Sequence, residues 1–584
     1  MQQELTVLKF GGSVLRTEAD LRTAVHEVYR WIRRGGKVIA VVSAFEGTTD
    51  RLIGQGQGVT PEADPVATPL LLATGELTTA SLVVLALRRA GVAATALSPA
   101  AAGLRTDGAG VDANPVSIDR AAIRRELESH SVVVVPGFVG VDERQQFTLL
   151  GRGGSDLTAL FVASELGATR CRLIKDVDGL YEHDPALPGP PPRRFEAISW
   201  DDALKLDEGI VQHKALRFAR SRGLSFDVGA FNRDSATRVG PHNTRFARGD
   251  QKRPLRVVLL GLGTVGLGVY ESIRALPESF TVVGVGCRDR AKAVAAGVPE
   301  GIVYTDMVRA IGLEADVVVE AIGGIRPAAA LIDAALRLGR DVVTANKSVI
   351  AADGERLLGV AEASGSRLRF SVAVGGSVPV LECVRALEET VGVRRVEGVL
   401  NGTCNFVLNE VQGGTGFAEA VRLAQVAGFA EADPVRDLSG VDAAEKLAVI
   451  AQFALGETLE AADIRSEELS EAAVWSSAGG AGSVLRQIAW LERVDGGEVR
   501  ACVELRRVAA RDAFFDLPGA TNRVRIQTWD GEWHTLAGAG AGRWPTTESV
   551  VADLLDLARE SRVVRPTHAV EIGGVSEREV AHVA

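Results

Sequence analysis

Apolar and polar residues alternate in blocks along the first 230 residues. Short runs rich in Val, Ile, Leu and Phe occupy residues 5–10, 37–45, 131–141 and 171–177. Longer apolar segments without strand-like alternation lie between them, at residues 77–90 and 155–168. Short apolar runs separated by helical segments are typical of parallel strands buried on both faces. The pattern predicts a mostly parallel sheet covered by helices.

A second series of strands and helices begins at residue 255, after a segment rich in Arg, Gly and Asn. Beyond about residue 386 the pattern changes to runs that are typical of antiparallel strands mixed with helices, at residues 394–400, 499–508, 522–531 and 532–538. Asp530–Gly531 lies between two of these runs and predicts a hairpin turn. The helical spacing of residues 441–455 places Asp442 and Lys446 on one helix face.

These patterns predict an α/β chain with several domains, as its 584 residues require. We predict a first α/β domain at 1–247, a linker at 248–254, a second α/β domain at 255–386, an α+β domain at 387–564 whose last segment returns to the second domain, and a flexible tail at 565–584.

Composition narrows the class of protein further. The net charge of -10, without a basic arm or face, argues against a nucleic-acid partner. Five scattered cysteines without metal-ligand spacing fit reduced thiols. The N-terminus is not a signal peptide, and the apolar segments are interrupted by Gly or too short to span a bilayer. We expect a cytoplasmic protein without a membrane partner.

A glycine-rich turn stands directly after the strand at 255–260. Gly261, Gly263 and Gly266, with Thr264 and Val265 between them, open the following helix. Such a turn lets a pyrophosphate approach the backbone at a helix N-terminus, which predicts a Rossmann dinucleotide site. Arg288 follows the next strand, where it would suit a 2′-phosphate, so NADPH is favoured over NADH. Asp289 and Arg290 beside it keep NADH open as the alternative.

Lys347 follows a later apolar strand, at the carboxyl edge where such sheets bind ligands. The motifs VTANKSVIA, VGGSVPV, EGVLNGTCNFVL and GAGAGRWPT follow one another along the chain. With these motifs, residues 255–557 resemble homoserine dehydrogenases, in which they occur in the same order. The family signature is matched in spacing by Ala424, Gly428, Asp433, Pro434, Asp437, Leu438, Gly440, Asp442 and Lys446.

The resemblance implies hydride transfer between aspartate semialdehyde and homoserine with a nicotinamide cofactor. It implies that Glu431 binds the substrate ammonium, that Asp442 orients the site, and that Lys347 and Lys446 flank the reacting oxygen. Two neighbouring ammonium groups should lower each other's pKa. Asp433 and Asp437 are either part of this site or loop supports.

The same resemblance implies further ligand contacts. It adds Thr403 and Asp437 to the substrate site, and Gly323, Lys347 and Gly542 to the cofactor site. A Na⁺ ion on backbone oxygens would involve Val374, Gly376 and Val378, although Ser371 replaces the family's acidic ligand.

Near the N-terminus, Lys9 precedes a turn formed by Gly11, Gly12 and Ser13, whose amides could bind an anion. The motifs VVSAFEGTTDRL, ATGELT, LLGRGGSDLTA and KDVDGLYEHDP follow in order, and residues 7–231 resemble the amino-acid-kinase fold, most closely aspartate kinase. The fold class is therefore an amino-acid-kinase domain followed by Rossmann and α+β domains.

The kinase resemblance implies phosphoryl transfer from Mg-ATP to aspartate. It places aspartate on Ser43, Glu76 and Arg152, lets Asp156 organise Lys9, and puts Asp178 and Tyr181 near the nucleotide. Two family cations are missing, at Ile210 and Ala186, and Lys214 or Arg217 is a candidate substitute. The rival interpretation is a homoserine dehydrogenase whose kinase-like half serves for binding or assembly; a third is a kinase for another small carboxylate.

Fused relatives of this kind carry a regulatory region between the two halves. Residues 232–255 are too few for one, since a domain needs about 50 residues. We therefore predict no inhibition by threonine through such a region. The antiparallel strands after Arg394 are candidates for pairing across a homodimer.

Overall fold

The computed structural model describes residues 4–108, 110–185, 192–206, 209–231, 233, 235–247, 253–374, 376, 378–430, 433–476, 482–494, 498–540 and 542–560. It divides the chain into two compact units, Met1–Gln251 and Lys252–Ala584. Ala186, Glu431, most of the predicted linker and the predicted tail lie outside the described residues.

The first unit is built on a nine-stranded, mostly parallel sheet. Its spatial order is β13 (Arg245–Phe246), β10 (Phe195–Ser199), β12 (Thr237–Gly240), β11 (Phe226–Gly229), β9 (Arg170–Ile174), β1 (Leu5–Phe10), β2 (Lys37–Val42), β6 (Val132–Pro136) and β3 (Ala94–Ala96). β1 lies between β2 and β9, parallel to both, with Phe10 opposite Val42 and Ile174. The carboxyl ends of these central strands therefore meet at one edge.

Helices cover this sheet, and a small second sheet lies in the same unit. The helices are α1 (Leu21–Ile32), α2 (Thr48–Val59), α3 (Ala67–Arg89), α4 (Arg120–Ser129), α5 (Gly154–Leu166), α6 (Trp200–Ala203) and α7 (His213–Ser221), with η1 at Glu18–Asp20. The small sheet has the order β5 (Pro115–Ser117), β4 (Arg105–Thr106), β7 (Val139–Val141) and β8 (Phe147–Leu149).

Two sequence predictions for this unit need correction. Residues 131–141 do not form one strand, because the chain breaks after Pro136 and β7 joins the small sheet. Among the described residues, α3 is long and apolar enough to cross a membrane, although the sequence suggested no such segment. Buried core helices of soluble proteins pass the same test, and 56% of its most apolar window is buried.

The second unit begins with a six-stranded parallel sheet. Its order is β16 (Val303–Tyr304), β15 (Phe280–Gly286), β14 (Leu255–Leu260), β17 (Val317–Glu320), β18 (Asp341–Thr344) and β19 (Leu368–Arg369). In chain order this is 3-2-1-4-5-6, the order of dinucleotide-binding folds, with the switch point at β14. The associated helices are α8 (Thr264–Arg274), α9 (Arg290–Ala295), η2 (Glu300–Ile302), α10 (Met307–Ile311), α11 (Ala328–Arg337), α12 (Lys347–Ser364), η3 (Ser371–Ala373) and α13 (Val380–Glu388).

A mixed, mainly antiparallel sheet follows in the same unit. Its order is β21 (Arg465–Ser466), β23 (Val499–Ala509), β22 (Ser483–Arg493), β20 (Val393–Val399), β24 (Thr521–Thr528) and β25 (Trp533–Ala539). Its helices are α14 (Gly402–Gln412), α15 (Phe417–Val426), α16 (Val435–Leu438), α17 (Val441–Ile450) and α18 (Glu471–Ser476), with η4 (Ala451–Leu455) and η5 (Ala461–Asp463). The predicted Asp530–Gly531 hairpin joins β24 to β25.

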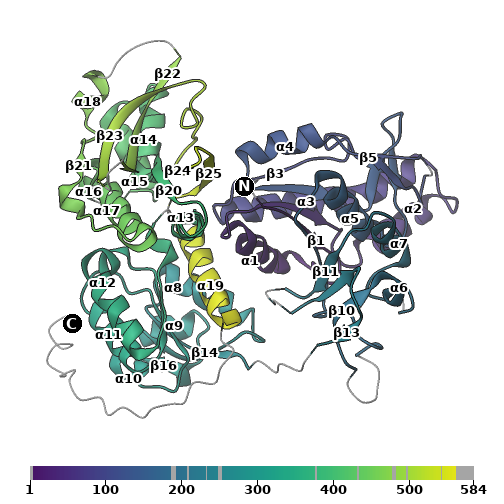
Figure 1. Ribbon diagram of the computed structural model, residues 1–584, viewed down its shortest axis with the longest axis horizontal. Helices are drawn as coiled ribbons and strands as arrows, with labels where there is room; N and C mark the ends of the chain where they lie inside the picture. Colours follow the sequence, from purple (N-terminus) through teal and green to yellow (C-terminus); the bar gives the residue numbers. More distant parts are fainter. Residues whose placement is uncertain are drawn as a thin grey trace. The chain divides into compact units, whose positions relative to one another are not determined.

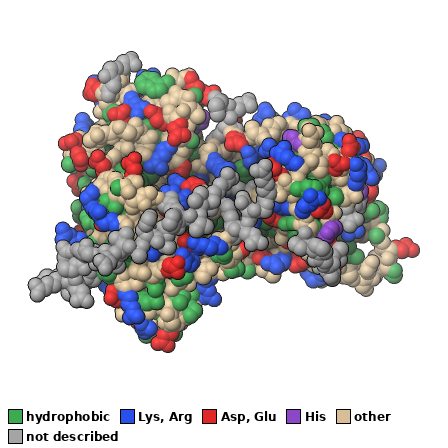
Figure 2. Space-filling view, turned by 60° about the horizontal axis from the view of Figure 1, so that its bottom comes forward, with side chains coloured by type: hydrophobic (Ala, Val, Ile, Leu, Met, Phe, Trp, Pro, Cys, Tyr) green, Lys and Arg blue, Asp and Glu red, His purple; other side chains and the backbone are tan. Residues whose placement is uncertain are grey.

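The last described helix, α19 (Arg543–Glu560), returns to the dinucleotide-binding sheet. It packs on α8 and β18, and Figure 1 shows it in yellow beside α8. Val550, Leu554 and Leu557 share one buried core with Val257 and Val269. The C-terminal segment thus completes one face of this domain. On the face drawn in Figure 2, the visible basic and acidic side chains are interspersed.

Candidate active sites

The turn after β14 has the backbone geometry that a pyrophosphate needs. Gly261 has φ +93°, and a side-chain carbon there would lie 2.5 Å from the Ala321 carbonyl oxygen. A side-chain carbon at Gly266 would lie 2.0 Å from the Gly261 carbonyl oxygen, so only glycine fits. Gly263 is the N-cap of α8, and Thr264 and Val265 form the first helical residues. These residues fit a dinucleotide phosphate at the helix N-terminus.

The end of β15 presents Arg288 to solvent. Among the described residues no ion pair involves its side chain, so its charge is available to a ligand. The neighbouring carboxylate of Asp289 accepts a 2.9 Å hydrogen bond from the Lys292 amide and caps α9. Asp289 thus serves as a helix cap, and Arg288 is an exposed candidate for contact with a ribose substituent.

The turns after β17 and β18 are joined by two residues that the sequence analysis did not single out. Glu320 is fully buried; it accepts hydrogen bonds from the Ile322 amide at 2.7 Å and the Thr344 hydroxyl at 2.5 Å. Asn346 caps α12 and donates to the Gly324 carbonyl at 2.5 Å. They hold Gly323 and Lys347 at the carboxyl edge of the sheet. Asparagine before a helix is the sequence signal for such a cap.

Asp442 joins Lys347 and Lys446 into one charged group. One carboxylate oxygen accepts from the Lys347 ammonium, and the other accepts from the Lys446 ammonium at 2.6 Å. Asp442 and Lys446 lie four residues apart on α17, as the spacing predicted, whereas Lys347 begins α12. The Lys446 and Asp442 side chains are 10% and 4% exposed, while Lys347 is 48% exposed. One lysine is therefore buried and the other faces solvent.

The pKa of Lys347 in this group is shifted in the direction opposite to the sequence prediction. Burial lowers the pKa of Lys347, but attraction and hydrogen bonding from Asp442 outweigh it, so its pKa is raised. The prediction that neighbouring ammonium groups would lower this pKa was wrong, because the intervening carboxylate dominates. Burial acts to raise the pKa of Asp442, yet Lys446 and Lys347 hold it well below its usual range. Asp442 is ionised at neutral pH.

Asn401 extends this group toward the signature loop. Its amide nitrogen donates to Asp437 at 2.7 Å and to Asp442 at 2.9 Å, and its oxygen caps α14 through the Cys404 amide. The Lys446 ammonium also donates to the Leu400 carbonyl at 2.8 Å. The sequence analysis missed Asn401, although an asparagine between a strand and a helix is a recognisable cap.

Other predicted residues of the signature region have structural contacts. Thr403 donates its hydroxyl to the Phe429 carbonyl at 2.6 Å. Asp433 is exposed and accepts from the Val435 amide at 3.2 Å, as a turn-forming aspartate does. Asp437 instead lies beside Asn401, within the charged group. The predicted ammonium ligand Glu431 lies outside the described residues.

Gly376 and Gly542, two of the predicted ligand contacts, lie in loops of the second unit. Gly376 has φ +67°, and a side-chain carbon there would lie 2.6 Å from the Gly540 carbonyl oxygen. Val374 and Val378 are buried apolar residues, which could serve an ion only through their own backbone oxygens. Ser371 donates to Asp553 at 2.6 Å. Gly542 has φ +122° and directly precedes α19.

The first unit holds a cleft of about 420 Å³ at the carboxyl edge of its central strands. Most of the predicted kinase residues line it, namely Lys9, Gly12, Ser13, Ser43, Glu76, Arg152 and Asp156. The amino end of α5 also reaches it through Gly153 and Gly154. The structure thus brings together residues that are up to about 150 positions apart, as the sequence motifs predicted.

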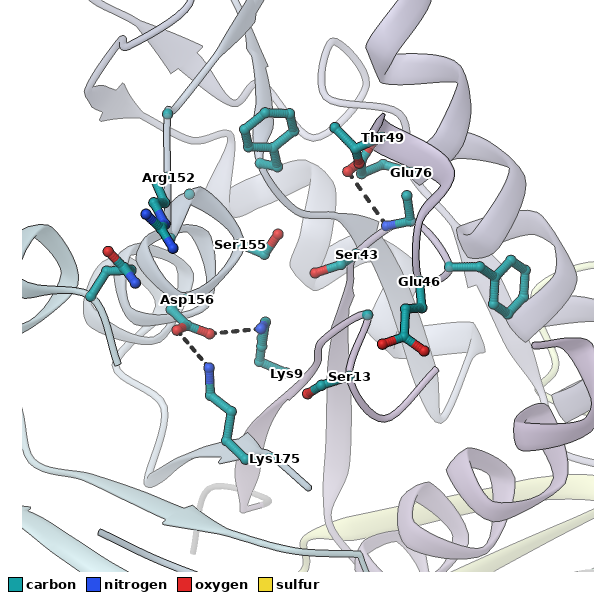
Figure 3. A pocket seen from close by; sticks show the side chains of 18 of the residues that line it. Lys9, Ser13, Ser43, Glu46, Thr49, Glu76, Arg152, Ser155, Asp156 and Lys175 are labelled. Atoms are coloured by element: carbon teal, nitrogen blue, oxygen red, sulfur yellow. Dashed lines mark hydrogen bonds and ion pairs between the residues drawn. The ribbon is translucent and has the colours of Figure 1, made fainter. Parts of the chain in front are cut away.

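Asp156 lies between two lysines in this cleft (Figure 3). Its oxygens lie 2.7 Å from the Lys9 ammonium and 2.9 Å from the Lys175 ammonium. Burial, with repulsion from Lys175, lowers the pKa of Lys9 to about 8 against the attraction of Asp156. Burial would raise the pKa of Asp156, but both lysines bring it to about 2. From the sequence, Lys175 is only the first residue of the motif KDVDGLYEHDP, without a role of its own.

Glu76 and Arg152 supply the complementary charges for a small zwitterion. Glu76 is 2% exposed, and burial raises its pKa to about 7. Its Oε1 accepts from the Ala44 amide at 3.4 Å, and its Oε2 has no hydrogen-bond partner among the described residues. Arg152 is exposed at the cleft and has no ion pair within the part of the chain described. A ligand with an ammonium and a carboxylate would satisfy both.

Three residues that were connected with the nucleotide lie outside the lining of this cleft. Asp178 and Tyr181 do not line the cleft but bond to each other, and Arg194 lies 3.5 Å from Asp178. Lys214, a suggested substitute cation, donates to Asp112 at 2.7 Å and to the carbonyls of Ala113 and Leu150. Ile210 does line the cleft, without charge.

Together, the two units define an enzyme with an oxidoreductase half and a kinase half. The homoserine dehydrogenase model matches residues 379–555, the model of the homoserine dehydrogenase NAD binding domain matches 261–371, and the amino acid kinase family model matches 4–225. The chain is 34% identical over 321 residues to homoserine dehydrogenase of Pseudomonas aeruginosa, covering 53% of this chain and 73% of that protein. The chain therefore belongs to the homoserine dehydrogenase family, with an amino acid kinase domain in its first half.

Two further similarities complete the comparison. The first half is 36% identical over 218 residues to an aspartokinase of Pseudomonas aeruginosa, covering 37% of this chain and 53% of that protein. The chain thus spans about half the length of that relative. A solved homoserine dehydrogenase from Thiobacillus denitrificans is 31% identical, covers 54% of this chain and 77% of that one, and has a TM-score of 0.49.

Proposed function

We propose that this chain is a bifunctional enzyme of the aspartate pathway. The second half reduces aspartate semialdehyde to homoserine with NADPH, and the first half phosphorylates the side-chain carboxylate of aspartate with Mg-ATP. The observation that carries the proposal is the buried carboxylate joined to two lysines that each half places at the carboxyl edge of its parallel sheet. Ligand sites of such sheets lie at that edge.

In the dehydrogenase half, a nicotinamide cofactor supplies the hydride when bound. Lys347, partly exposed and protonated because of its raised pKa, donates a hydrogen bond to the substrate carbonyl oxygen and the proton it gains. Asp442 orients this ammonium, and buried Lys446 holds Asp442 from the other side. Glu431 and Asp437 bind the substrate ammonium, with Thr403 supporting the loop.

In the kinase half, catalysis is positioning and charge stabilisation. Arg152 binds an aspartate carboxylate, Glu76 and Ser43 hold the ammonium end, and the amides of Gly11, Gly12 and Ser13 face phosphoryl oxygens. Lys9 stabilises the charge of the transferring group, oriented by Asp156. Asp178 and Tyr181 remain candidates for the adenosine end.

The decisive experiment measures both activities in the same preparation. Aspartyl phosphate is trapped as hydroxamate with aspartate and Mg-ATP, and NADPH oxidation is followed with aspartate semialdehyde. We expect both signals from the intact chain, loss of hydroxamate alone in Lys9→Ala, and loss of NADPH oxidation alone in Lys446→Ala. NADPH oxidation without any hydroxamate would instead support the rival, a dehydrogenase with an inactive kinase-like domain.

The choice of NADPH rests on Arg288. Its exposed guanidinium, which has no ion pair among the described residues, suits a 2′-phosphate, whereas Asp289 is engaged as a helix cap. Arg288→Ser should raise the KM for NADPH about tenfold or more and leave the KM for NADH little changed. Equal effects on both cofactors would remove the argument for NADPH.

Three further expectations belong to this proposal. A Na⁺ ion would bind carbonyl oxygens of Val374, Gly376 and Val378. A homodimer would form through the antiparallel sheet of the second half. The protein would act in the cytoplasm on small-molecule substrates.

A further inference from the structure

The cleft of the kinase half contains three cationic side chains among the residues described. They are Lys9, Arg152 and Lys175. Arg152 stands exposed at the cleft, whereas the side chains of Lys9 and Lys175 are only 7% and 11% exposed. Burying a lysine is costly unless it is paired, so two buried lysines on one carboxylate need an explanation.

The two lysines are brought together by neighbouring strands. Lys9 is on β1, and Lys175 directly follows β9, its parallel neighbour, with Phe10 opposite Ile174. The Lys175 amide also donates to the Gly229 carbonyl at 2.8 Å, which ties the residue to the end of β11. Figure 3 shows both ammonium groups pointing to Asp156. The group Lys9–Asp156–Lys175 therefore carries one net positive charge.

Besides Lys9 and Lys175, no side chain that lines the cleft is a buried cation among the residues that the structure describes. Ile210 lines the cleft as a neutral residue. Lys214 is held by Asp112 and by the carbonyls of Ala113 and Leu150, and it does not line the cleft. A transferring phosphoryl group spreads negative charge over three oxygens and needs cations close to it. Within the described lining of the cleft, Lys175 is the remaining buried cation in position to meet this need.

We propose that Lys175 is a catalytic residue of the kinase half. It is a second phosphoryl-binding cation, and it supplies the positive charge that the neutral Ile210 does not provide. The proposal rests on the kinase function proposed above. In the reaction a substrate carboxylate oxygen bonds to the terminal phosphorus of ATP, the bond from that phosphorus to the bridging oxygen breaks, and the electron pair leaves with ADP. Lys175 donates hydrogen bonds to phosphoryl oxygens and keeps its proton throughout.

The test removes the positive charge at residue 175 and introduces one at residue 210. Lys175→Met removes the ammonium at nearly constant length, Lys175→Arg keeps a cation, and Ile210→Lys offers one from another wall of the same cleft. Kinase turnover and the KM values for ATP and aspartate are measured in the intact chain, with NADPH oxidation recorded on the same samples. Lys205→Met, an exposed lysine paired with Asp202, is the matched control.

We expect Lys175→Met to lower kinase turnover about 100-fold, with the KM for aspartate and NADPH oxidation little changed. Lys175→Arg should retain part of the activity, and the double variant Lys175→Met/Ile210→Lys should recover about tenfold. Lys205→Met should match the parent. Recovery by a charge from another position is not expected if Lys175 only holds Asp156 in place.

Two results would overturn the proposal. Turnover of Lys175→Met close to that of the parent, while Lys9→Ala is inactive, would show that the second cation is dispensable. Lys175 would instead be a structural partner of Asp156 if Lys175→Met and Lys175→Arg are both inactive and the double variant Lys175→Met/Ile210→Lys recovers no activity. If the parent makes no hydroxamate but still oxidises NADPH, the kinase function itself fails, and that outcome is distinct from both.

Discussion

Asp442 links two lysines that come from different helices, Lys347 at the start of α12 and Lys446 on α17. Replacing it with asparagine leaves two ammonium groups close together without their counter-ion. We expect Asp442→Asn to lower the turnover of NADPH oxidation about 100-fold, because the proton donor loses its orientation. The measurement is steady-state kinetics with aspartate semialdehyde.

The matched control for this variant is Asp433→Asn. Asp433 lies in the same loop region but is exposed, and its one hydrogen bond among the described residues is accepted from the Val435 amide. Its replacement should leave turnover little changed. Nearly full activity of Asp442→Asn would show that the two lysines do not need the carboxylate between them.

Glu76 makes the kinase half sensitive to pH in a predictable direction. Its pKa rises from 4.5 to about 7 on folding, because burial disfavours the charged form. The folded state then holds a proton that the unfolded state has lost, so stability falls as pH rises from about 4.5 to about 7. The full penalty above that range is on the order of 3 kcal/mol.

Glu76→Gln removes this titration, so the variant should melt higher than the parent near pH 8 and show no such advantage near pH 4. Thermal melting of the intact chain at both pH values, without ligands, checks the difference. Glu46→Gln, an exposed carboxylate at the same cleft, is the control and should show no such trend. A pH-independent effect of Glu76→Gln would contradict the raised pKa.

At both sites the sequence predicted which residues take part better than it predicted their pKa values and ion pairs. Lys9, Asp156, Asp442 and Lys446 stand in recognisable motifs, and the structure brings each pair together. The pKa of Lys347 could not be predicted, because it depends on a carboxylate 95 positions away. Lys175 was missed as a cleft cation for the same reason, since the pairing of β1 with β9 places it beside Asp156.

At the level of elements, Gly268 lets α8 approach α19. A side-chain carbon at this position would lie 2.4 Å from the Thr547 hydroxyl oxygen. Gly268→Ala should therefore destabilise the second half by about 1–3 kcal/mol, since overpacking a close contact forces the helices apart. Urea unfolding followed by tryptophan fluorescence measures the change.

A second substitution tests whether this contact is the cause. Thr547→Ala removes the atom that the new methyl group meets, and the Thr547 hydroxyl has no hydrogen-bond partner among the described residues. Gly268→Ala/Thr547→Ala should recover most of the loss, and Gly301→Ala, which meets no atom within 4 Å, should cost little. Additive losses in the double variant would place the cause elsewhere.

The periodicity of apolar residues predicts some of the strands and misses others. Buried parallel strands and the Asp530–Gly531 hairpin follow from local patterns, and β1, β2, β9 and β14 lie where these patterns predicted. β22 was not predicted, although it pairs with β23 over its whole length. Residues 485–489 of this strand are all buried, so no alternation is visible, and Leu485, Ile488 and Ala489 have helical spacing.

At the scale of the whole molecule, both halves contain a buried aspartate between two lysines. In the kinase half Asp156 contacts Lys9 and Lys175, and in the dehydrogenase half Asp442 contacts Lys347 and Lys446. The two halves differ in fold and strand order, so they share the chemistry of this charged group and not its structural setting. Each reaction develops negative charge on oxygen, and an ammonium held by a carboxylate is ready to meet it without reorganisation.

The junction between the halves gives the last prediction. The final kinase strand ends at Phe246 and the first dinucleotide-binding strand begins at Leu255, so too few residues lie between them for a regulatory domain of about 50 residues. Neither activity should fall across a threonine series that reaches about 10 mM, about ten times a Kd of about 1 mM. Serine over the same range controls for non-specific effects, and saturable inhibition by threonine alone would show that an effector binds one of the catalytic domains directly.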